Sequence, residues 1–171
     1  MKPRGKVGQA SRLSTSNAKT GETPVRLTHL DQRGRACMVD VSAKPVQFRE
    51  AVARGSIKLQ PATIRLIKAN GIAKGDVLNT ARLAGIQAAK RTGDLIPLCH
   101  PLNLTHIDVD LRPESNRIDI TATAKIAAQT GVEMEALTAV AVAALTIYDM
   151  CKAVDKKMVI GEIKLVSKRK T

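Results

Sequence analysis

The feature that most constrains the fold is a long helical segment that has no charged face. From Ala136 to Tyr148 the chain carries only alanine, valine, leucine, isoleucine, threonine and the final tyrosine. A helix that is apolar nearly all round is buried on more than one side. Because one small sheet covers only one side, we expect the helix, over residues 133–154, to pack against a second subunit. The run from 136 to 147 is too short to span a bilayer.

Composition defines the rest of the core and the class of protein. The 171 residues, one domain in length, include one Tyr, one Phe and no Trp, so the core must consist of Ala, Val, Ile and Leu. The three cysteines, Cys37, Cys99 and Cys151, are odd in number and widely spaced. They predict neither a disulfide framework nor a zinc site, and the compartment is expected to be reducing. We therefore predict no cofactor.

The net charge of +13 is concentrated at the ends of the chain. Residues 1–26 carry a net +5 and residues 168–170 another +3, which leaves +5 between them. We predict a disordered basic N-terminal extension over 1–26 and a basic C-terminal tail over 169–171. The extension suits a solubilising or anion-binding role better than a transit peptide, because it has no amphipathic pattern. The remaining excess favours an anionic ligand.

Periodicity and turn signals divide the remainder into strands and helices. We expect strands at 36–41, 47–59, 106–111, 117–124 and 158–166, and helices at 62–69, 77–91 and 133–154. Pro113 to Asn116 marks the turn of a hairpin. Because strands outnumber helices and hairpins dominate, we predict an α+β fold with a mainly antiparallel sheet and helices on one face.

One short segment suggests a small-molecule site. Residues 95–102 read Leu-Ile-Pro-Leu-Cys-His-Pro-Leu, which places His100 in a backbone restricted by two prolines. Such a segment can hold an imidazole poised near neutral pH, although a buried strand end with a core histidine is the simpler interpretation. A Cys99 nucleophile activated by His100 is disfavoured, because adjacent side chains on an extended segment point to opposite faces.

The two ends of the long helix carry the other candidate groups. Glu133 and Glu135 near its start suit the positive end of the helix dipole, and Asp149 with Lys152 forms either a surface ion pair or a proton-transfer couple. Glu133 and Asp149 are separated by about 24 Å along one helix. They either serve different sites or belong to one pocket assembled from two chains. Lys74, before Gly75 in a turn, is either solvated or ligand-facing.

Taken in order, these segments resemble the MoaC family of cyclic pyranopterin monophosphate synthases from about Leu27 to Lys168. The segments that carry the resemblance are Leu27-Thr28-His29, Met38-Val39-Asp40-Val41-Ser42, Lys74-Gly75-Asp76, 84–90, 95–102, 130–138 and 143–154. The family commonly continues beyond its last strand with a Ser-Gly-Gly-Lys-like tail, where this chain has Ser167-Lys168-Arg169-Lys170.

The resemblance implies a fold, an assembly and a reaction. The fold would be ferredoxin-like, in a homohexamer built as a trimer of dimers with active sites at the dimer interface, and the domain would cover 27–168. The enzyme would be a cytoplasmic lyase of molybdenum cofactor biosynthesis. It would convert 3',8-cyclo-7,8-dihydro-GTP, a GTP-derived triphosphate, to cyclic pyranopterin monophosphate and release pyrophosphate.

The resemblance also implies roles for individual residues. Asp149 would be the acid/base, with Lys74 and Lys152 in the same pocket. Residues matching substrate-contacting positions are Leu98, Cys99, His100, Met134 and Glu135, and further pocket positions with less defined roles are Glu133, Asp40 and Lys168. Our hypothesis is that Lys74 and Lys152 act as acid/base groups and charge stabilisers, while His100 positions the substrate.

Two rival functions are weighed against this one. A basic nucleic-acid-binding module is favoured by the isoelectric point of about 10.1. The near absence of aromatic residues for base stacking and the lack of a recognition motif argue against it, so no specific nucleic acid and no membrane are expected as partners. A catalytically inactive scaffold is disfavoured because Lys74, His100, Glu135, Asp149 and Lys152 are all present.

Overall fold

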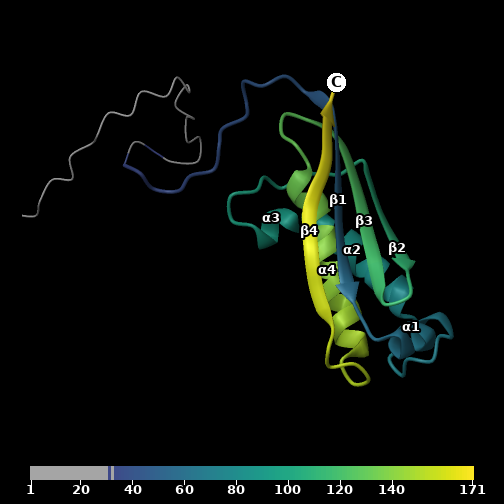
Figure 1. Ribbon diagram of the computed structural model, residues 1–171. Helices are drawn as coiled ribbons and strands as arrows, with labels where there is room; N and C mark the ends of the chain where they lie inside the picture. Colours follow the sequence, from purple (N-terminus) through teal and green to yellow (C-terminus); the bar gives the residue numbers. More distant parts are fainter. Residues whose placement is uncertain (1–30, 32) are drawn as a thin grey trace, which may run out of the picture.

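The fold is an antiparallel sheet covered by helices on one face (Figure 1). The computed structural model describes residue 31 and residues 33–171, so the predicted extension, 1–26, and the Leu27-Thr28-His29 motif lie outside the described residues. The elements in chain order are β1 (Gln47–Lys58), α1 (Pro61–Lys68), α2 (Val77–Lys90), α3 (Thr92–Leu95), β2 (His106–Pro113), β3 (Arg117–Ala128), α4 (Glu133–Cys151) and β4 (Val159–Lys170).

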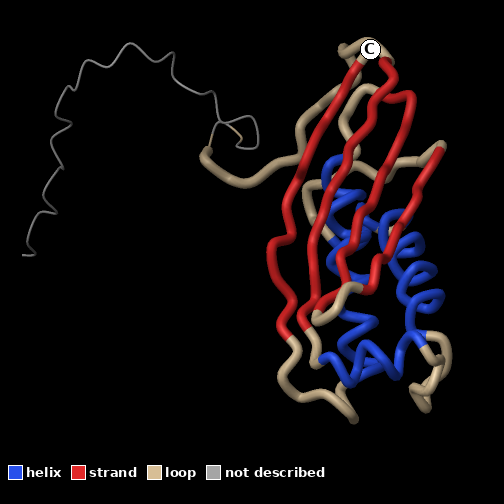
Figure 2. Tube along the Cα trace, turned by 45° about the vertical axis from the view of Figure 1, so that its right-hand side comes forward, coloured by secondary structure: helices blue, strands red, loops and turns tan. Residues whose placement is uncertain are grey.

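The strands pair in the order β2-β3-β1-β4, and every pairing is antiparallel. The helices lie together behind the sheet (Figure 2), where α4 packs on β1 and β3 and α2 packs on β2 and on α4. Along β3, buried residues alternate with more exposed ones, which is the pattern of a strand with one covered face. The predicted α+β class, antiparallel sheet and single helical layer are confirmed.

Local sequence signals explain where the first two helices begin and end. Pro61 occupies the first turn of α1, and the helix ends before Asn70, whose φ of 53° is left-handed. The Asp76 carboxylate accepts a hydrogen bond from the Asn79 backbone N–H at 3.0 Å and thus caps α2. These bounds confirm the two predicted helices to within a residue or two.

Two local predictions are wrong. The segment 36–41 forms no strand, because only Ala36 makes a single bridge and the rest has no ladder partner. The short helix α3 was not predicted, since Thr-Gly-Asp-Leu has no helical periodicity. Thr92 secures its start by donating from its hydroxyl to the Ala89 carbonyl at 3.0 Å.

The last strand is longer than its sequence pattern indicates. Alternation stops after Val166 and basic residues follow, yet β4 continues to Lys170, where Arg169 pairs with Glu50 and Lys170 with Arg49. Thr171 then exchanges two backbone hydrogen bonds with Phe48. Arg169 and Lys170 are therefore strand residues rather than part of a basic tail.

The core is aliphatic, as the composition requires. Buried isoleucines of the sheet pack in one cluster with the buried side of α4. The sheet contributes Ile57, Ile118 and Ile120, and α4 contributes Ala139, Ala143 and Ile147. The two aromatic residues, Phe48 and Tyr148, remain exposed. Gly85 brings α2 against α4, since a Cβ there would lie 2.9 Å from the Ala139 carbonyl oxygen. Small side chains at this crossing let the two helices approach closely.

The sheet and α2 together cover more of α4 than the sequence suggests. By length and composition alone α4 is long and apolar enough to cross a membrane, but half of its most apolar stretch is buried in the fold. α4 therefore packs as part of the core of this fold. Met134, Leu145 and Tyr148 remain exposed on it.

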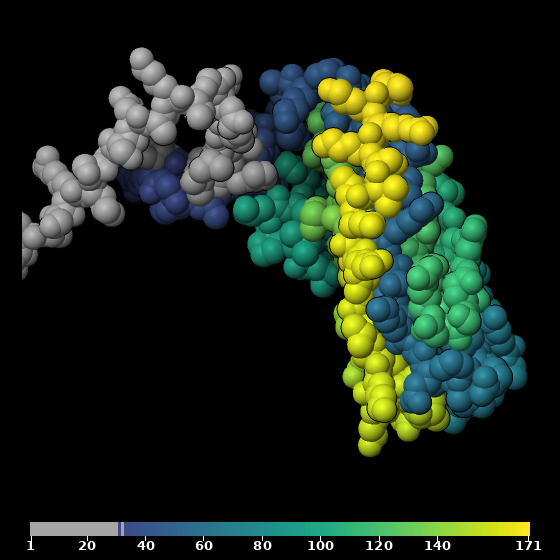
Figure 3. Space-filling model, viewed as in Figure 1, coloured from purple at the N-terminus to yellow at the C-terminus, as the bar shows by residue number. Residues whose placement is uncertain are grey.

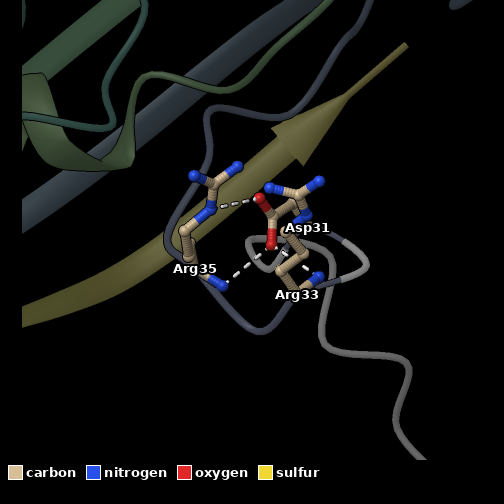
Figure 4. Close-up of polar contacts among 3 residues, drawn as sticks. All are labelled: Asp31, Arg33 and Arg35. Carbon is tan, nitrogen blue, oxygen red and sulfur yellow. Dashed lines mark hydrogen bonds and ion pairs between the residues drawn. The ribbon is translucent and has the colours of Figure 1, made fainter.

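The first described residues form a local turn around Asp31 (Figure 4). Its carboxylate accepts hydrogen bonds from the backbone N–H groups of Arg33 and Arg35 and from Nε of Arg35, at 2.8 to 2.9 Å. This is the Asx-turn geometry that aspartate favours. The turn precedes the unpaired segment that lines the site described next.

Candidate functional site

The first candidate cluster lies at the C-terminal end of α4. Lys74 comes from the turn between α1 and α2, where Gly75 has a φ of 97° that a side chain would strain. Its Nζ lies 2.7 Å from Asp149 Oδ2 and 2.9 Å from the Asp149 carbonyl oxygen. Lys152 Nζ lies 2.7 Å from Asp149 Oδ1. One carboxylate therefore holds two ammonium groups from different parts of the chain.

The two ammonium groups control the protonation of the Asp149 carboxyl. The hydrogen bonds from Lys152 and Lys74 lower the pKa of Asp149 to about 2, and the same contact raises the pKa of Lys152. Asp149 is thus a stable carboxylate at neutral pH, and all three side chains are about half exposed. When an anionic ligand approaches, the lysines can turn from Asp149 to the ligand. The proton donors of the cluster are accordingly the ammonium groups rather than the carboxyl.

The second candidate cluster is a cavity of about 340 Å³ at the other end of α4. It lies between the segments before β1, after α3 and at the start of α4. Its lining residues are Val39, Val41, Lys44, Leu98, Cys99, His100, Leu102, Thr130, Gly131, Glu133, Met134 and Glu135. Six of the predicted substrate-contacting or pocket residues meet here, which are Leu98, Cys99, His100, Glu133, Met134 and Glu135.

His100 is held in one orientation in this cavity. Its Nε2–H donates to the Val39 carbonyl oxygen at 2.9 Å. This bond fixes the ring and leaves Nδ1 for a ligand. It also explains the failed strand prediction, because the backbone at Val39 is tied to His100 instead of to a sheet neighbour.

Glu135 is the buried titratable group of the cavity. Its side chain is 3% exposed, and desolvation, with a smaller contribution from the charge of Glu133, raises its pKa to about 7. A carboxyl with such a pKa can both hold and release a proton near neutral pH. From the sequence, Glu135 was expected to complement the helix dipole, and the family resemblance implied a substrate contact. Neither indicated that its carboxyl is buried.

Cys99 closes a turn, and His100 follows it directly, so the two residues do not lie in one extended segment. The Cys99 N–H donates to the Ile96 carbonyl at 3.0 Å, and both side chains line the same cavity. The expectation that they point to opposite faces is therefore wrong. Burial and the nearby Glu135 charge raise the pKa of the Cys99 thiol, which disfavours a thiolate nucleophile.

Two further predicted residues, Lys168 and Asp40, lie outside the lining of the cavity. Lys168 Nζ of β4 lies 2.7 Å from Glu133 Oε1. Although burial opposes it, this hydrogen bond lowers the pKa of Glu133. Asp40 accepts from the Ser42 N–H at 2.9 Å, is exposed, and does not line the cavity. Its pKa is lowered by the bonds to Ser42 and by the nearby His100.

The two clusters lie at opposite ends of α4 and do not meet within one chain. Figure 1 shows the helix running along the sheet, with α1 towards its C-terminal end and α3 near its start. Lys74, Asp149 and Lys152 consequently do not line the His100 cavity. Within residues 31 and 33–171 no group of three His, Cys, Asp or Glu side chains is arranged to hold a metal ion.

Sequence reasoning missed several residues of the cavity wall. Lys44 and Val41 line the cavity, and Arg49 and Lys170 line an adjoining groove. Lys44 comes two residues after the Val-Asp-Val-Ser motif, so its position was a usable signal. Arg49 and Lys170 become neighbours only through strand pairing, which local periodicity does not reveal.

Known proteins provide an independent comparison. A family model described as "MoaC family" matches residues 38–171. The chain is 59% identical to a cyclic pyranopterin monophosphate synthase of Parvibaculum lavamentivorans, over 84% of this chain and 91% of that protein. It is 61% identical to one of Chloroflexus aggregans, over 84% and 88% of the two chains. A synthase of Clostridium perfringens is 59% identical, over 84% and 92%. The chain therefore belongs to the MoaC family.

Proposed function

We propose that the protein is a cyclic pyranopterin monophosphate synthase. It is a lyase that converts 3',8-cyclo-7,8-dihydro-GTP to cyclic pyranopterin monophosphate and pyrophosphate in molybdenum cofactor biosynthesis. The family match over 38–171 and relatives of that name at 59–61% identity support this function. The observation that carries it is the Asp149 carboxylate held between Lys74 and Lys152, each at 2.7 Å.

The lysine pair suits the steps that move protons and charge. Opening the ring that joins ribose and base needs proton transfers in both directions, and Lys74 and Lys152 supply ammonium donors at one point. Closing the cyclic phosphate needs a ribose hydroxyl aligned with the α-phosphate and stabilisation of the departing pyrophosphate. In this proposal Asp149 holds both lysine side chains in position until the substrate arrives.

The His100 cavity suits the base and ribose end of the substrate. His100 offers a fixed ring nitrogen, and Glu135 offers a carboxyl that titrates near pH 7. Leu98 and Met134 supply apolar walls beside them. This combination of apolar surface and a few directed polar groups is typical of small-molecule sites.

The geometry favours a pocket shared by two protomers. The two clusters lie at opposite ends of α4, about 24 Å apart, too far for one small molecule to contact both in one chain. A partner that brings its α4 C-terminus to the His100 cavity would complete the site. Exposed apolar residues on α4 and β4, such as Leu145 and Leu165, support such packing. The β-α-β-β-α-β order with sheet order β2-β3-β1-β4 supports a ferredoxin-like topology. The assembly that we assign is a homohexamer built as a trimer of dimers.

The remaining assignments follow from the proposed reaction. The partner molecule is the GTP-derived triphosphate, and no cofactor is assigned, with Mg²⁺ bound to the triphosphate left open. We assign no membrane and no specific nucleic acid as partners and place the protein in the cytoplasm. The three cysteines are free, as expected for a reducing compartment. The enzymatic domain, expected from the sequence at 27–168, is assigned an end beyond 168, because Arg169 and Lys170 pair with β1.

The test is to incubate the purified oligomer with 3',8-cyclo-7,8-dihydro-GTP and to follow pyrophosphate release and pterin formation together. We expect both products from the wild type and neither from Asp149→Ala. Asp110→Ala is the matched control, since Asp110 also pairs with a cation at 2.7 Å but lies on the sheet, away from both clusters. Absence of both products from an assembled wild-type oligomer would overturn the proposal.

A further inference from the structure

A buried carboxylate that the proposed reaction does not use lies just beyond the C-terminal end of α4. Asp155 comes three residues after Lys152 and is 1% exposed. Its Oδ2 accepts hydrogen bonds from the Gln60 N–H at 2.8 Å and from the Thr63 hydroxyl at 3.1 Å. Its Oδ1 accepts from Gln60 Nε2 at 3.1 Å and from the Lys157 N–H at 3.0 Å. Donors from two distant parts of the chain therefore meet on one carboxylate.

This carboxylate anchors the turn that carries Lys152. The helix α4 ends at Cys151, and the N–H groups of Val154 and Asp155 donate to the Cys151 carbonyl oxygen at 2.9 and 3.0 Å. Lys152 lies inside this turn, and its own N–H donates to the Tyr148 carbonyl oxygen at 2.9 Å. The end of a helix frays unless its last turn is held. The buried side chain of Asp155 holds this turn against the rest of the fold.

The same carboxylate fixes the start of α1. Gln60 is the N-cap residue of that helix, but its side chain makes no capping bond to it. Asp155 instead accepts from the Gln60 N–H and from the Thr63 hydroxyl in the first turn. A negative charge at this point also suits the positive end of the helix dipole. Buried isoleucines seat α1 in the core, and Lys74 follows in the turn after it.

Asp155 thus joins the two segments that supply the lysines of the first cluster. Among the described residues, the side-chain hydrogen bonds between segments 60–74 and 149–155 are those of Lys74 with Asp149 and those that Asp155 accepts. Figure 3 shows α1 (blue) and the residues after α4 (yellow-green) at the lower end of the molecule. The Lys74–Asp149 pair is about half exposed, and exposed ion pairs contribute little stability. The buried bonds to Asp155 are therefore the stronger link between the segments.

We propose that Asp155 is a positioning residue of the synthase, which sets the placement of Lys74 and Lys152 around Asp149 by clamping α1 to the turn after α4. This inference rests on the proposed function for the reaction that the two lysines serve. Asp155 itself does not contact the substrate, because its carboxylate is buried and both oxygens are engaged. A displacement of about 1 Å at a reacting group can cost roughly 100-fold in rate. A clamp that prevents such a displacement therefore matters for turnover as well as for stability.

The first measurement follows the titration of the Asp149 carboxyl by ¹³C NMR on the assembled oligomer and needs no substrate. Because the two lysines lower the pKa of Asp149 to about 2, its wild-type signal should stay constant from about pH 7 to about pH 3.5. In Asp155→Asn the new NH₂ group faces N–H or O–H donors, so the clamp loosens and the lysines separate. The Asp149 signal should then begin to titrate below about pH 5, as an ordinary aspartate does. Asp149→Asn identifies the signal by its loss.

The second measurement compares kcat and KM for 3',8-cyclo-7,8-dihydro-GTP at a temperature where every variant is folded. We expect kcat of Asp155→Asn to fall about 10- to 100-fold with little change in KM, because the cavity at the other end of α4 is unaltered. Thr63→Val removes one bond to Asp155 and should lower kcat less, whereas Thr63→Ser keeps the hydroxyl and should behave like the wild type. Gly85→Ala controls for lost stability, since it disturbs the α2–α4 crossing and should keep the wild-type kcat.

Two results would overturn the inference. One is an Asp149 titration in Asp155→Asn that matches the wild type, and the other is a kcat no lower than that of Gly85→Ala. If Asp155→Asn does not fold, Thr63→Val decides by the same two measurements, and wild-type behaviour in both would overturn the clamp. Failure of the proposed function is separable, because it appears as absence of turnover in the wild type. A shifted Asp149 titration would in that case retain the clamp and refute the synthase.

Discussion

Lys74 Nζ, from the turn before α2, lies 2.7 Å from Asp149 Oδ2 at the end of α4. The two residues are 75 positions apart in the chain. Asp149 also holds Lys152, so a single carboxylate lowers the repulsion between two ammonium groups that would otherwise separate. The contact depends on the turn at Gly75 and on the length of α4. It links an ordinary turn lysine to the proposed chemistry.

Replacement of Lys74 by alanine should abolish most activity and leave the fold intact. The side chain is about half exposed, so little packing is lost, whereas a proton-transfer group is worth roughly 100-fold or more in rate. Pyrophosphate release from the cyclised substrate, measured beside Lys68→Ala as an exposed control, gives the comparison. Wild-type turnover by Lys74→Ala would exclude the lysine from the reaction.

The stability of the protein should depend on pH through Glu135. Because burial raises its pKa from 4.5 to about 7, the unfolded chain loses a proton between these values while the folded chain keeps it. The free energy of unfolding therefore falls as pH rises from about 4.5 to 7 and then levels off. Between pH 5 and pH 8 the free energy of unfolding of the wild type should fall by about 2–3 kcal/mol more than that of Glu135→Gln.

Urea unfolding of both proteins at pH 5 and pH 8, at one fixed protein concentration, measures this difference. Glu114→Gln, in an exposed turn, serves as the control and should follow the wild type. Parallel pH dependences of the wild type and Glu135→Gln would show that Glu135 titrates as an ordinary carboxyl.

Asp155 should be one of the most sensitive positions in the chain. It is 1% exposed and accepts hydrogen bonds from the Gln60 N–H at 2.8 Å, the Thr63 hydroxyl at 3.1 Å and the Lys157 N–H at 3.0 Å. It thereby ties the segment after α4 to the start of α1. Removing the carboxylate leaves these donors unsatisfied, and Asp155→Ala should lower the free energy of unfolding by about 2–4 kcal/mol.

Denaturant titration of Asp155→Ala and Asp155→Asn provides the measurement, and the asparagine variant should retain part of the stability. Although burial opposes it, bonds from Gln60, Lys157 and Thr63 lower the pKa of Asp155, so its contribution is present above pH 4 and declines at lower pH. If Asp155→Ala lost no more unfolding free energy than an exposed control such as Glu114→Ala, the prediction would be contradicted.

A methyl group at Gly85 should disturb the packing of α2 on α4. The added Cβ would lie 2.9 Å from the Ala139 carbonyl oxygen and 3.3 Å from the Ala143 Cβ. Both neighbours belong to a buried helix, so Gly85→Ala should cost about 1–3 kcal/mol despite the better helix propensity of alanine. Gly161→Ala, where a Cβ meets nothing within 4 Å, is the control. Equal thermal unfolding midpoints for the two variants would refute the close crossing.

Local sequence determined most of the elements of the fold. Pro61, Asp76 and the Pro113–Asn116 turn gave boundaries that the structure reproduces, because capping and turn chemistry act over a few residues. The shortage of aromatics required an aliphatic core, and the core is aliphatic. The uncharged helix indicated burial on more than one side, although α2 supplies much of the cover that was expected from another subunit.

Tertiary structure decided which of the candidate residues meet. Glu133 and Lys168, Lys74 and Asp149, and Arg49 and Lys170 become neighbours only through sheet pairing and helix packing across long stretches of sequence. The pKa of Glu135 depends on burial, which no local pattern specifies. The sequence alone determined the residue types and the local elements, since these follow from short-range sterics and hydrogen bonding. The distances between these side chains, the pairing of their charges and the desolvation of Glu135 depend on long-range packing. Only the folded chain determines them.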